Sequence, residues 1–282
     1  MTYLVRIVQI LLMLGLPVGL WLWVRRRLGA PWGLIGAGML TFVLSQVVHL
    51  PLNWALGLLG GERGVALWPV PWMALVAGLS AGICEEGARY VVLRFWRREA
   101  RSWKEGVAFG AGHGGIEAFL LGLLVLFAFL QMIALRGMDL EGMGLSGEML
   151  EQVQAQIEAY WSVPWYLPLL GGLERAFALA VQIGLTLMVV RSLTRNVGWL
   201  ALAVLAHALV DGLAVGLMKV GWSIPAIEGV VFLLALAAVV FVVVMRREEG
   251  PVAAEDVSRE TSPALLGGQE RVAEPQGAEE EF

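Results

Sequence analysis

Three apolar segments of this 282-residue chain carry charged or titratable side chains where a membrane helix tolerates them least. Each segment combines a carboxylate with a basic group: Glu85, Glu86 and Arg89 in the first, His113 and Glu117 in the second, His207 and Asp211 in the third. Carboxylates together with imidazoles are the usual groups for general acid–base catalysis and for zinc binding. We therefore expect a chemical site inside the membrane, with Glu85, Glu86, His113, Glu117 and His207 as its catalytic candidates.

In each segment two polar residues lie four positions apart, so they share one face of a helix. This spacing predicts three local pairs: Glu85 with Arg89, His113 with Glu117, and His207 with Asp211. In these pairs Arg89 would orient the Glu85 carboxylate, and each histidine would have its tautomer fixed by a carboxylate.

The depth of these groups in the membrane predicts that they meet. A helix rises about 1.5 Å per residue, which places His113 roughly 10 Å and His207 roughly 15 Å from the cytoplasmic ends of their spans. Glu85 and Glu86 lie roughly 12 Å above the basic cluster that ends their own span. The expected result is one layer of acids and histidines in the cytoplasmic half of the bilayer. A buried ion-pair network that only locks the helices together is the structural alternative.

Other polar residues of the spans are predicted to support this layer. Glu174 and Arg175 are adjacent in the outer half of the fifth span, where they pair with other helices or line an access path. Gln182 lies near the active layer and can form hydrogen bonds, but an amide is a poor metal ligand. Gln46 and His49 share a face of the second span, and His49 is interpreted as a packing or hydrogen-bonding residue.

Composition predicts an all-α, polytopic membrane protein. The chain is 58% hydrophobic and 16% charged, and its mean hydropathy is +0.73. These values exclude an ordinary soluble domain, and several apolar runs are long enough to span a bilayer. We expect a bundle of about seven transmembrane helices, near 3–24, 32–57, 66–90, 106–135, 163–190, 197–218 and 223–245.

Basic residues predict how this bundle is oriented. Clusters follow the first, third, fifth and seventh spans: Arg25, Arg26 and Arg27; Arg94, Arg97, Arg98, Arg101 and Lys104; Arg191 and Arg195; Arg246 and Arg247. All four fall on one side, which the positive-inside rule makes cytoplasmic. The N-terminus is then outside and the C-terminus inside.

Two regions are expected outside the membrane. Residues 137–162 form an external loop with a short polar helix over 148–160, either a substrate-gating cap or a solvated connector. Residues 1–247 make up the membrane domain. Residues 248–282, rich in Glu, Ala, Gly and Pro, are expected to be a disordered acidic cytoplasmic tail.

Four ordered motifs carry a resemblance to a known family. They are Glu-Glu-Gly-Ala-Arg-Tyr from Glu85, Gly-His-Gly-Gly-Ile-Glu-Ala from Gly112, the run from Pro164 to Glu174-Arg175, and His-Ala-Leu-Val-Asp from His207. Together they resemble the YhfC family of intramembrane metalloproteases, over the chain from the first to the seventh span. That family is similar to a wider group that includes the CAAX prenyl endopeptidases and PrsW-type proteases.

The resemblance implies hydrolysis of a peptide bond within the membrane. Glu85 would be the general base, assisted by Glu86. If a metal is bound, zinc being the expected ion, its ligands would be His113, His207 and Glu86. Gln182 stands where the family pattern leads us to expect a histidine, so a metal-free glutamate mechanism stays open.

Two other classes of protein remain as alternatives: a catalytically silent scaffold or immunity-type protein of the same fold, and a proton-coupled membrane protein. Membrane lipids and a peptide or membrane-protein substrate are the expected partners. The sequence has no nucleotide-binding loop and no nucleic-acid-binding patch, so neither nucleotides nor nucleic acids are expected.

Overall fold

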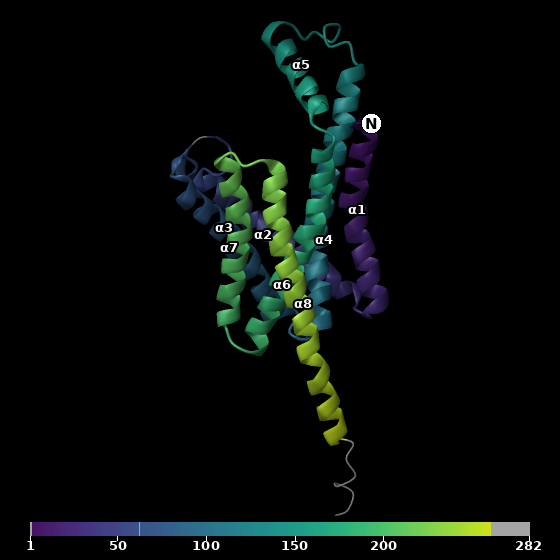
Figure 1. Ribbon diagram of the computed structural model, residues 1–282, viewed down its shortest axis with the longest axis vertical. Coiled ribbons are helices and arrows are strands. Elements are labelled where there is room, and N and C mark those ends of the chain that lie inside the picture. The colour runs from purple at the N-terminus through teal and green to yellow at the C-terminus, as the bar shows by residue number, and fades with distance from the viewer. Residues whose placement is uncertain (1, 62, 261–282) are drawn as a thin grey trace, which may run out of the picture.

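The structure is a computed structural model that describes residues 2–61 and 63–260, and every regular element in these residues is helical (Figure 1). The eight α-helices are α1 (Thr2–Arg27), α2 (Trp32–Leu56), α3 (Val70–Val91), α4 (Trp103–Gly137), α5 (Gly147–Ser162), α6 (Tyr166–Thr194), α7 (Gly198–Lys219) and α8 (Ile224–Glu260). A 3₁₀ turn, Gly64–Leu67, precedes α3, and a π-helical turn, Val92–Trp96, follows it. The all-α prediction is confirmed.

Six of these helices are long and apolar enough to cross a membrane: α1, α2, α4, α6, α7 and the part of α8 as far as Glu248. Each coincides with a span predicted from hydropathy. The remaining predicted span, 66–90, falls on α3, which is not among the six. Glu85, Glu86 and Arg89 all lie on this helix and lower its hydropathy.

A local signal explains where α4 begins. The Ser102 side chain accepts a hydrogen bond from the backbone of Glu105, and the Glu105 carboxylate accepts one from Ser102 in return, so a capping box starts α4.

At the other end of the chain, α8 continues to Glu260, past residue 248 where the acidic tail was expected to begin. The rest of that predicted tail, 261–282, lies outside the described residues.

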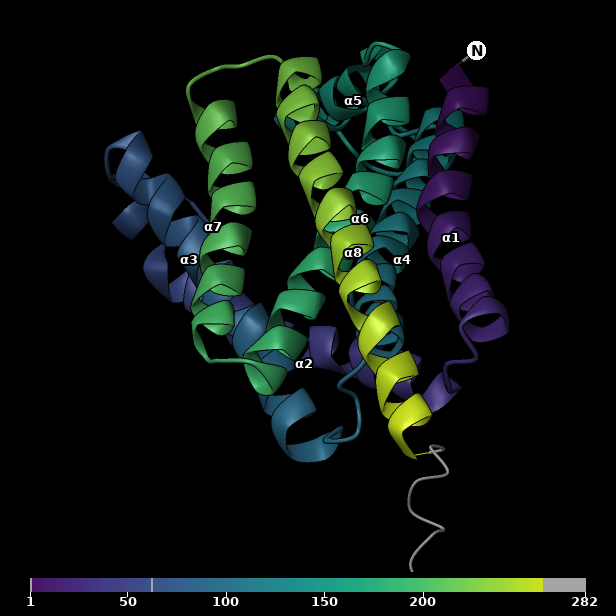
Figure 2. The ribbon, with the colours of Figure 1, turned by 60° about the horizontal axis from the view of Figure 1, so that its bottom comes forward.

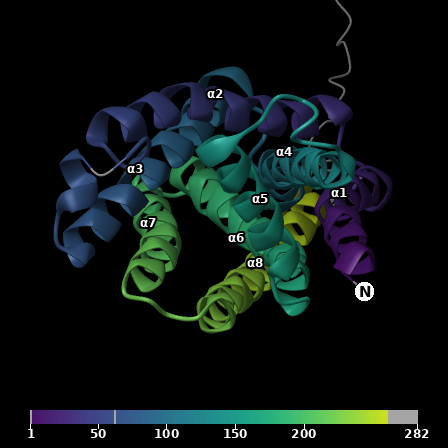
Figure 3. The same ribbon diagram turned by 90° about the horizontal axis from the view of Figure 1, so that it is seen from above.

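The helices pack as pairs around a common interior. Helix α3 lies along α7, α4 packs on α1, α2 and α6, and α8 covers α6. Seen from above, α2 runs obliquely across one side of the molecule and contacts both α3 and α4 (Figure 3). The tilted view shows α6 passing between the α3–α7 pair and the α4–α1 pair (Figure 2). This arrangement turns faces of α2, α3, α4, α6 and α7 toward one region.

Glycines set very close helix contacts, and two of these contacts lie beside the histidines of the chemical segments. A Cβ at Gly112 of α4 would lie 2.0 Å from the carbonyl oxygen of Ile35 on α2. A Cβ at Gly78 of α3 would lie 2.2 Å from the carbonyl oxygen of Ala208 on α7. Such distances are possible only without a side chain, as is common between membrane helices. The second contact lies one residue from His207, and the first lies one residue from His113.

We expect Gly112→Ala to destabilise the protein by about 1–3 kcal/mol, because the added methyl group must push α2 and α4 apart. Thermal unfolding in detergent micelles measures the effect. Gly36→Ala on α2 is the matched control, since a Cβ there meets nothing within 4 Å. Equal stabilities of the two variants would mean that the close approach at Gly112 is not required.

Helix α5, which confirms the polar helix predicted over 148–160, is held against the membrane helices at one end. The Arg6 guanidinium of α1 donates a hydrogen bond to the carbonyl oxygen of Tyr160 and lies 3.6 Å from the centre of its ring. The Arg136 guanidinium at the end of α4 lies 5.2 Å from the ring of Trp161. Cation–π contacts of this kind fix the helix beside the bundle.

Candidate functional site

Helix α3 turns its three charged residues into the protein interior. Glu85 is 6% exposed, and Glu86 and Arg89 are fully buried. The Arg89 guanidinium donates a hydrogen bond to the Glu86 carboxylate, and it lies 3.6 Å from Oε2 of Glu85. The predicted Glu85–Arg89 pair is therefore present, but Glu86 is the closer partner. Because a buried carboxylate needs a compensating charge, this arginine stabilises both acids.

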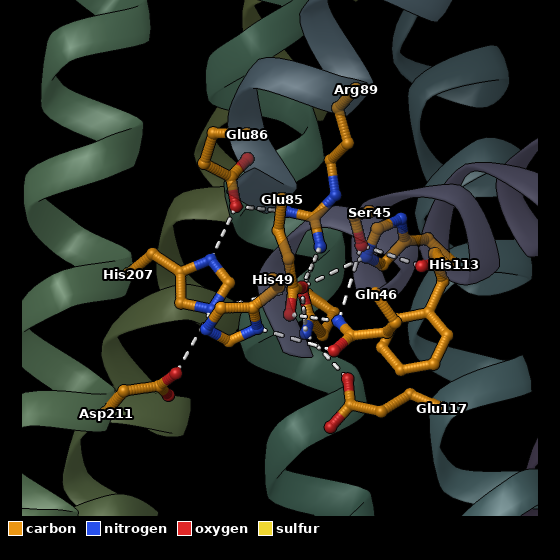
Figure 4. A network of polar contacts seen from close by, with 12 residues as sticks. Ser45, Gln46, His49, Glu85, Glu86, Arg89, His113, Glu117, His207 and Asp211 are labelled. Carbon is orange, nitrogen blue, oxygen red and sulfur yellow. Dashed lines mark hydrogen bonds and ion pairs between the residues drawn. The ribbon is translucent and has the colours of Figure 1, made fainter. Parts of the chain in front are cut away.

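The two histidines reach this carboxylate pair from opposite sides (Figure 4). Nε2 of His113, on α4, lies 3.1 Å from Oε2 of Glu85. Nδ1 of His207, on α7, lies 2.7 Å from Oε1 of Glu86, while its Nε2 lies 4.0 Å from Oε2 of Glu85. The Glu85 carboxylate thus stands between the Nε2 atoms of two buried imidazoles, and the predicted meeting of the three segments is confirmed.

The local pairs within α4 and α7 have different outcomes. Asp211 does contact His207, at 3.5 Å from Nε2 to Oδ2, as predicted. The predicted pair of His113 with Glu117 is wrong, since His113 turns to Glu85 and Glu117 turns to α6. Within the described residues, Nδ1 of His113 has no hydrogen-bond partner. His113 and Glu117 share a face of α4, but each pairs with a side chain of another helix, His113 with Glu85 and Glu117 with Gln182.

Helix α6 supplies a second group of polar side chains. Nε2 of Gln182 donates to Oε2 of Glu117 at 2.7 Å, and Oε1 of Gln182 accepts from Arg89. Arg175 donates to Oε1 of Glu117 at 3.2 Å and also pairs with its neighbour Glu174. Gln182, predicted as a supporting residue, therefore contacts Arg89 and Glu85 directly, while Glu174 and Arg175 are connected to the carboxylate pair through Glu117 and Gln182.

A polar cavity of about 120 Å³ adjoins this cluster. Its charged and polar lining residues come from α4, α6 and α7: Glu117, Glu174, Arg175, Gln182, His207 and Asp211. A volume of this size is enough for a few water molecules, which polar walls can hold by hydrogen bonds. The cluster therefore has a space beside it where water and a polar group of a substrate fit.

Helix α2 contributes two polar side chains, Gln46 and His49, to the edge of the cluster. Nε2 of Gln46 donates to Oε1 of Glu85 at 3.1 Å, so this glutamine holds the carboxylate oxygen that does not face the histidines. His49 forms hydrogen bonds with Gln46, Asn53 and Ser80, as expected for a hydrogen-bonding residue. The sequence shows that Gln46 and His49 share a face of this helix, but it does not show which helix that face meets, so the contact of Gln46 with Glu85 was not predicted.

The donor atoms of the cluster are those that zinc prefers, namely imidazole nitrogens and carboxylate oxygens. No group of three His, Cys, Asp or Glu side chains within residues 2–61 and 63–260 is already arranged to hold a metal ion. Glu86 is poorly placed to share an ion with Nε2 of His207, because it binds the opposite nitrogen of that ring. Glu85 faces Nε2 of both histidines and is the better third ligand.

Fold and site together define a helical membrane protein with a buried carboxylate–imidazole centre at the meeting point of its helices. The model of one family, the YhfC intramembrane metalloproteases, matches residues 12–232, and the chain belongs to this family. A relative from Bacillus subtilis (strain 168), described as an uncharacterized membrane protein YhfC, is 33% identical over 239 residues. The match covers 82% of this chain and 92% of the relative. No solved structure matches the chain.

Proposed function

We propose that this integral membrane protein is a zinc peptidase that hydrolyses a peptide bond within a bacterial cytoplasmic membrane. The observation that carries the proposal is the position of Glu85, held between Nε2 of His113 and Nε2 of His207 beside a polar cavity. A network that served only to lock helices together would not need two imidazoles aimed at one carboxylate next to space for water. The family to which the chain belongs supports the same class of reaction.

The proposed topology includes α3 as a further span, which makes seven, with the N-terminus outside and the C-terminus cytoplasmic. Helix α3 packs between α2 and α7, and its charges are buried, so lipid does not meet them. Three basic clusters lie close together at the end of the bundle where α8 leaves: Arg97 donates to the Gly33 carbonyl oxygen, Arg191 pairs with Glu248, and Arg246 lies 5.3 Å from the ring of Trp103. Their shared side supports a cytoplasmic assignment.

In the proposed site, Glu85, His113 and His207 would hold the ion. Zinc supplies Lewis acidity, which makes water a stronger nucleophile at neutral pH and polarises a carbonyl group. Glu86 accepts a hydrogen bond from Nδ1 of His207 and so presents Nε2 of that ring to the site, as carboxylates commonly do for metal-binding histidines. Arg89 compensates the charge of both carboxylates.

Glu117 is proposed as the general base in place of Glu85. Its carboxylate lines the cavity, whereas Oε2 of Glu85 is enclosed by the two histidines. From that position Glu117 would take a proton from water and pass it to the leaving amine. Arg175 donates a hydrogen bond to Oε1 of Glu117, and this bond keeps the carboxylate turned toward the cavity. Asp211 faces the same cavity, with Oδ2 3.5 Å from Nε2 of His207.

Metal analysis of detergent-purified protein tests this proposal. We expect close to one zinc per chain in the wild type and its loss in His113→Ala, together with loss of cleavage of a membrane peptide. His49→Ala is the control for zinc content, because His49 is the remaining histidine of the chain and reaches Glu85 only through Gln46. Cleavage by a wild-type protein free of metal would overturn the zinc site and leave a glutamate mechanism. A wild type that neither binds zinc nor cleaves would overturn the peptidase.

A further inference from the structure

Gln182 occupies a position that the proposed chemistry does not yet explain. It is 6% exposed and projects from α6 into the space between α3 and α4. Its amide uses both of its ends: Oε1 accepts from Arg89, while Nε2 donates to Glu117 at 2.7 Å and lies 3.4 Å from Oε2 of Glu85. One side chain therefore contacts the proposed base, the proposed ligand and the arginine that compensates the charge of that ligand.

A primary amide suits this position better than any other side chain of its size. A carboxylate could accept from Arg89 but could not donate to Glu117, and a neutral imidazole has a single N–H, so it could not face both carboxylates as a donor. Helix α4 leaves room for the amide: a Cβ at Gly114 would lie 2.7 Å from Cβ of Gln182. The glutamine is thus built into the contact between α4 and α6.

We propose that Gln182 is the positioning residue of the site, which fixes the distance between the base Glu117 and the ligand Glu85 while it anchors Arg89. The inference rests on the proposed function. Its amide N–H group lies between the two carboxylates and keeps two like charges at a defined separation. The glutamine that stands where a histidine was expected is then a working part of the site.

Two substitutions that nearly keep the size of the side chain test the hydrogen bonds of the amide to Arg89 and to Glu117. Gln182→Glu keeps the acceptor for Arg89 but loses the donor to Glu117, and Gln182→Met loses both. For each we expect kcat for cleavage to fall roughly 10–100-fold, the usual effect of removing a partner that orients a catalytic group, with KM changed less than about twofold. Gln154→Glu on the exposed face of α5 is the matched control and should keep wild-type values.

A second measurement does not depend on activity. The double variant Glu117→Gln/Gln182→Glu exchanges the two side chains, so an amide can again donate to a carboxylate and the net charge is unchanged. We expect its unfolding temperature in detergent to exceed that of Gln182→Glu, and the double-mutant cycle to show favourable coupling. Cleavage should stay low, because the base has been replaced.

The outcomes distinguish this inference from the proposed function. A wild type that cleaves, with Gln182→Glu and Gln182→Met as active as Gln154→Glu, would overturn the positioning role and leave the peptidase standing. Variants that lose only stability, with unchanged kcat per folded molecule, would also overturn it, as would an exchange without coupling. A wild type that cleaves no peptide and binds no zinc overturns the proposed function and, with it, any role of Gln182 in the reaction.

Discussion

Glu85→Gln should reduce peptide cleavage by roughly 10³-fold or more, the effect expected for a group that acts at the reacting centre. The amide has the shape of the carboxylate and can still meet Gln46 and His113, so the bundle should remain folded. What it loses is the negative charge that faces the two histidines and Arg89. Zinc content should fall in parallel, because an amide is a weaker ligand than a carboxylate.

Glu99→Gln provides the comparison for this result. The Glu99 side chain is 63% exposed and pairs with Arg97 at 3.4 Å, so its neutralisation should leave cleavage and zinc content unchanged. Circular dichroism and thermal unfolding of both variants establish that each is folded. If Glu85→Gln cleaved within tenfold of the wild type, the centre of the chemistry would lie elsewhere in the cluster.

The helices and the residues of the site could be predicted from the sequence, because hydropathy and residue spacing are properties of a short stretch of chain and do not depend on the fold. Apolar runs gave six membrane-length helices at the expected places, and the polar run 148–160 gave α5. Charged residues within apolar segments are costly, and this cost identified Glu85, Glu86, His113 and His207 before any fold was known. Each of these four side chains is buried in the cluster.

The partners of these residues could not be predicted, because spacing tells which side chains share a face and not which helix that face meets. His113 and Glu117 satisfy the spacing rule, yet each binds a residue from another helix. The close contacts at Gly112 and Gly78 decide which helices meet, and a glycine-rich segment has several possible partners. For the same reason the sequence suggested that Gln182 replaces a metal-binding histidine. In the structure its amide instead links Arg89 on α3 with Glu117 on α4.

Arg89→Met should lower the free energy of unfolding by about 3–5 kcal/mol, more than Gly112→Ala. Arg89 is fully buried and is bound to Glu86, which is fully buried as well, and to Gln182. Methionine fills much of the volume but leaves the Glu86 carboxylate without its cation in a medium of low polarity. Thermal or denaturant unfolding in detergent micelles measures the loss.

Two further variants decide whether the loss comes from the buried charge. Arg94→Met, one turn beyond α3 on an exposed position, should change stability by less than about 0.5 kcal/mol. Glu86→Gln/Arg89→Met removes both charges and should recover part of the loss, because an uncharged amide tolerates burial better than an unpaired carboxylate. If the double variant were as unstable as Arg89→Met, packing would account for the effect. Recovery would mean that this arginine allows two carboxylates to lie side by side between the histidines, the condition on which the proposed site depends.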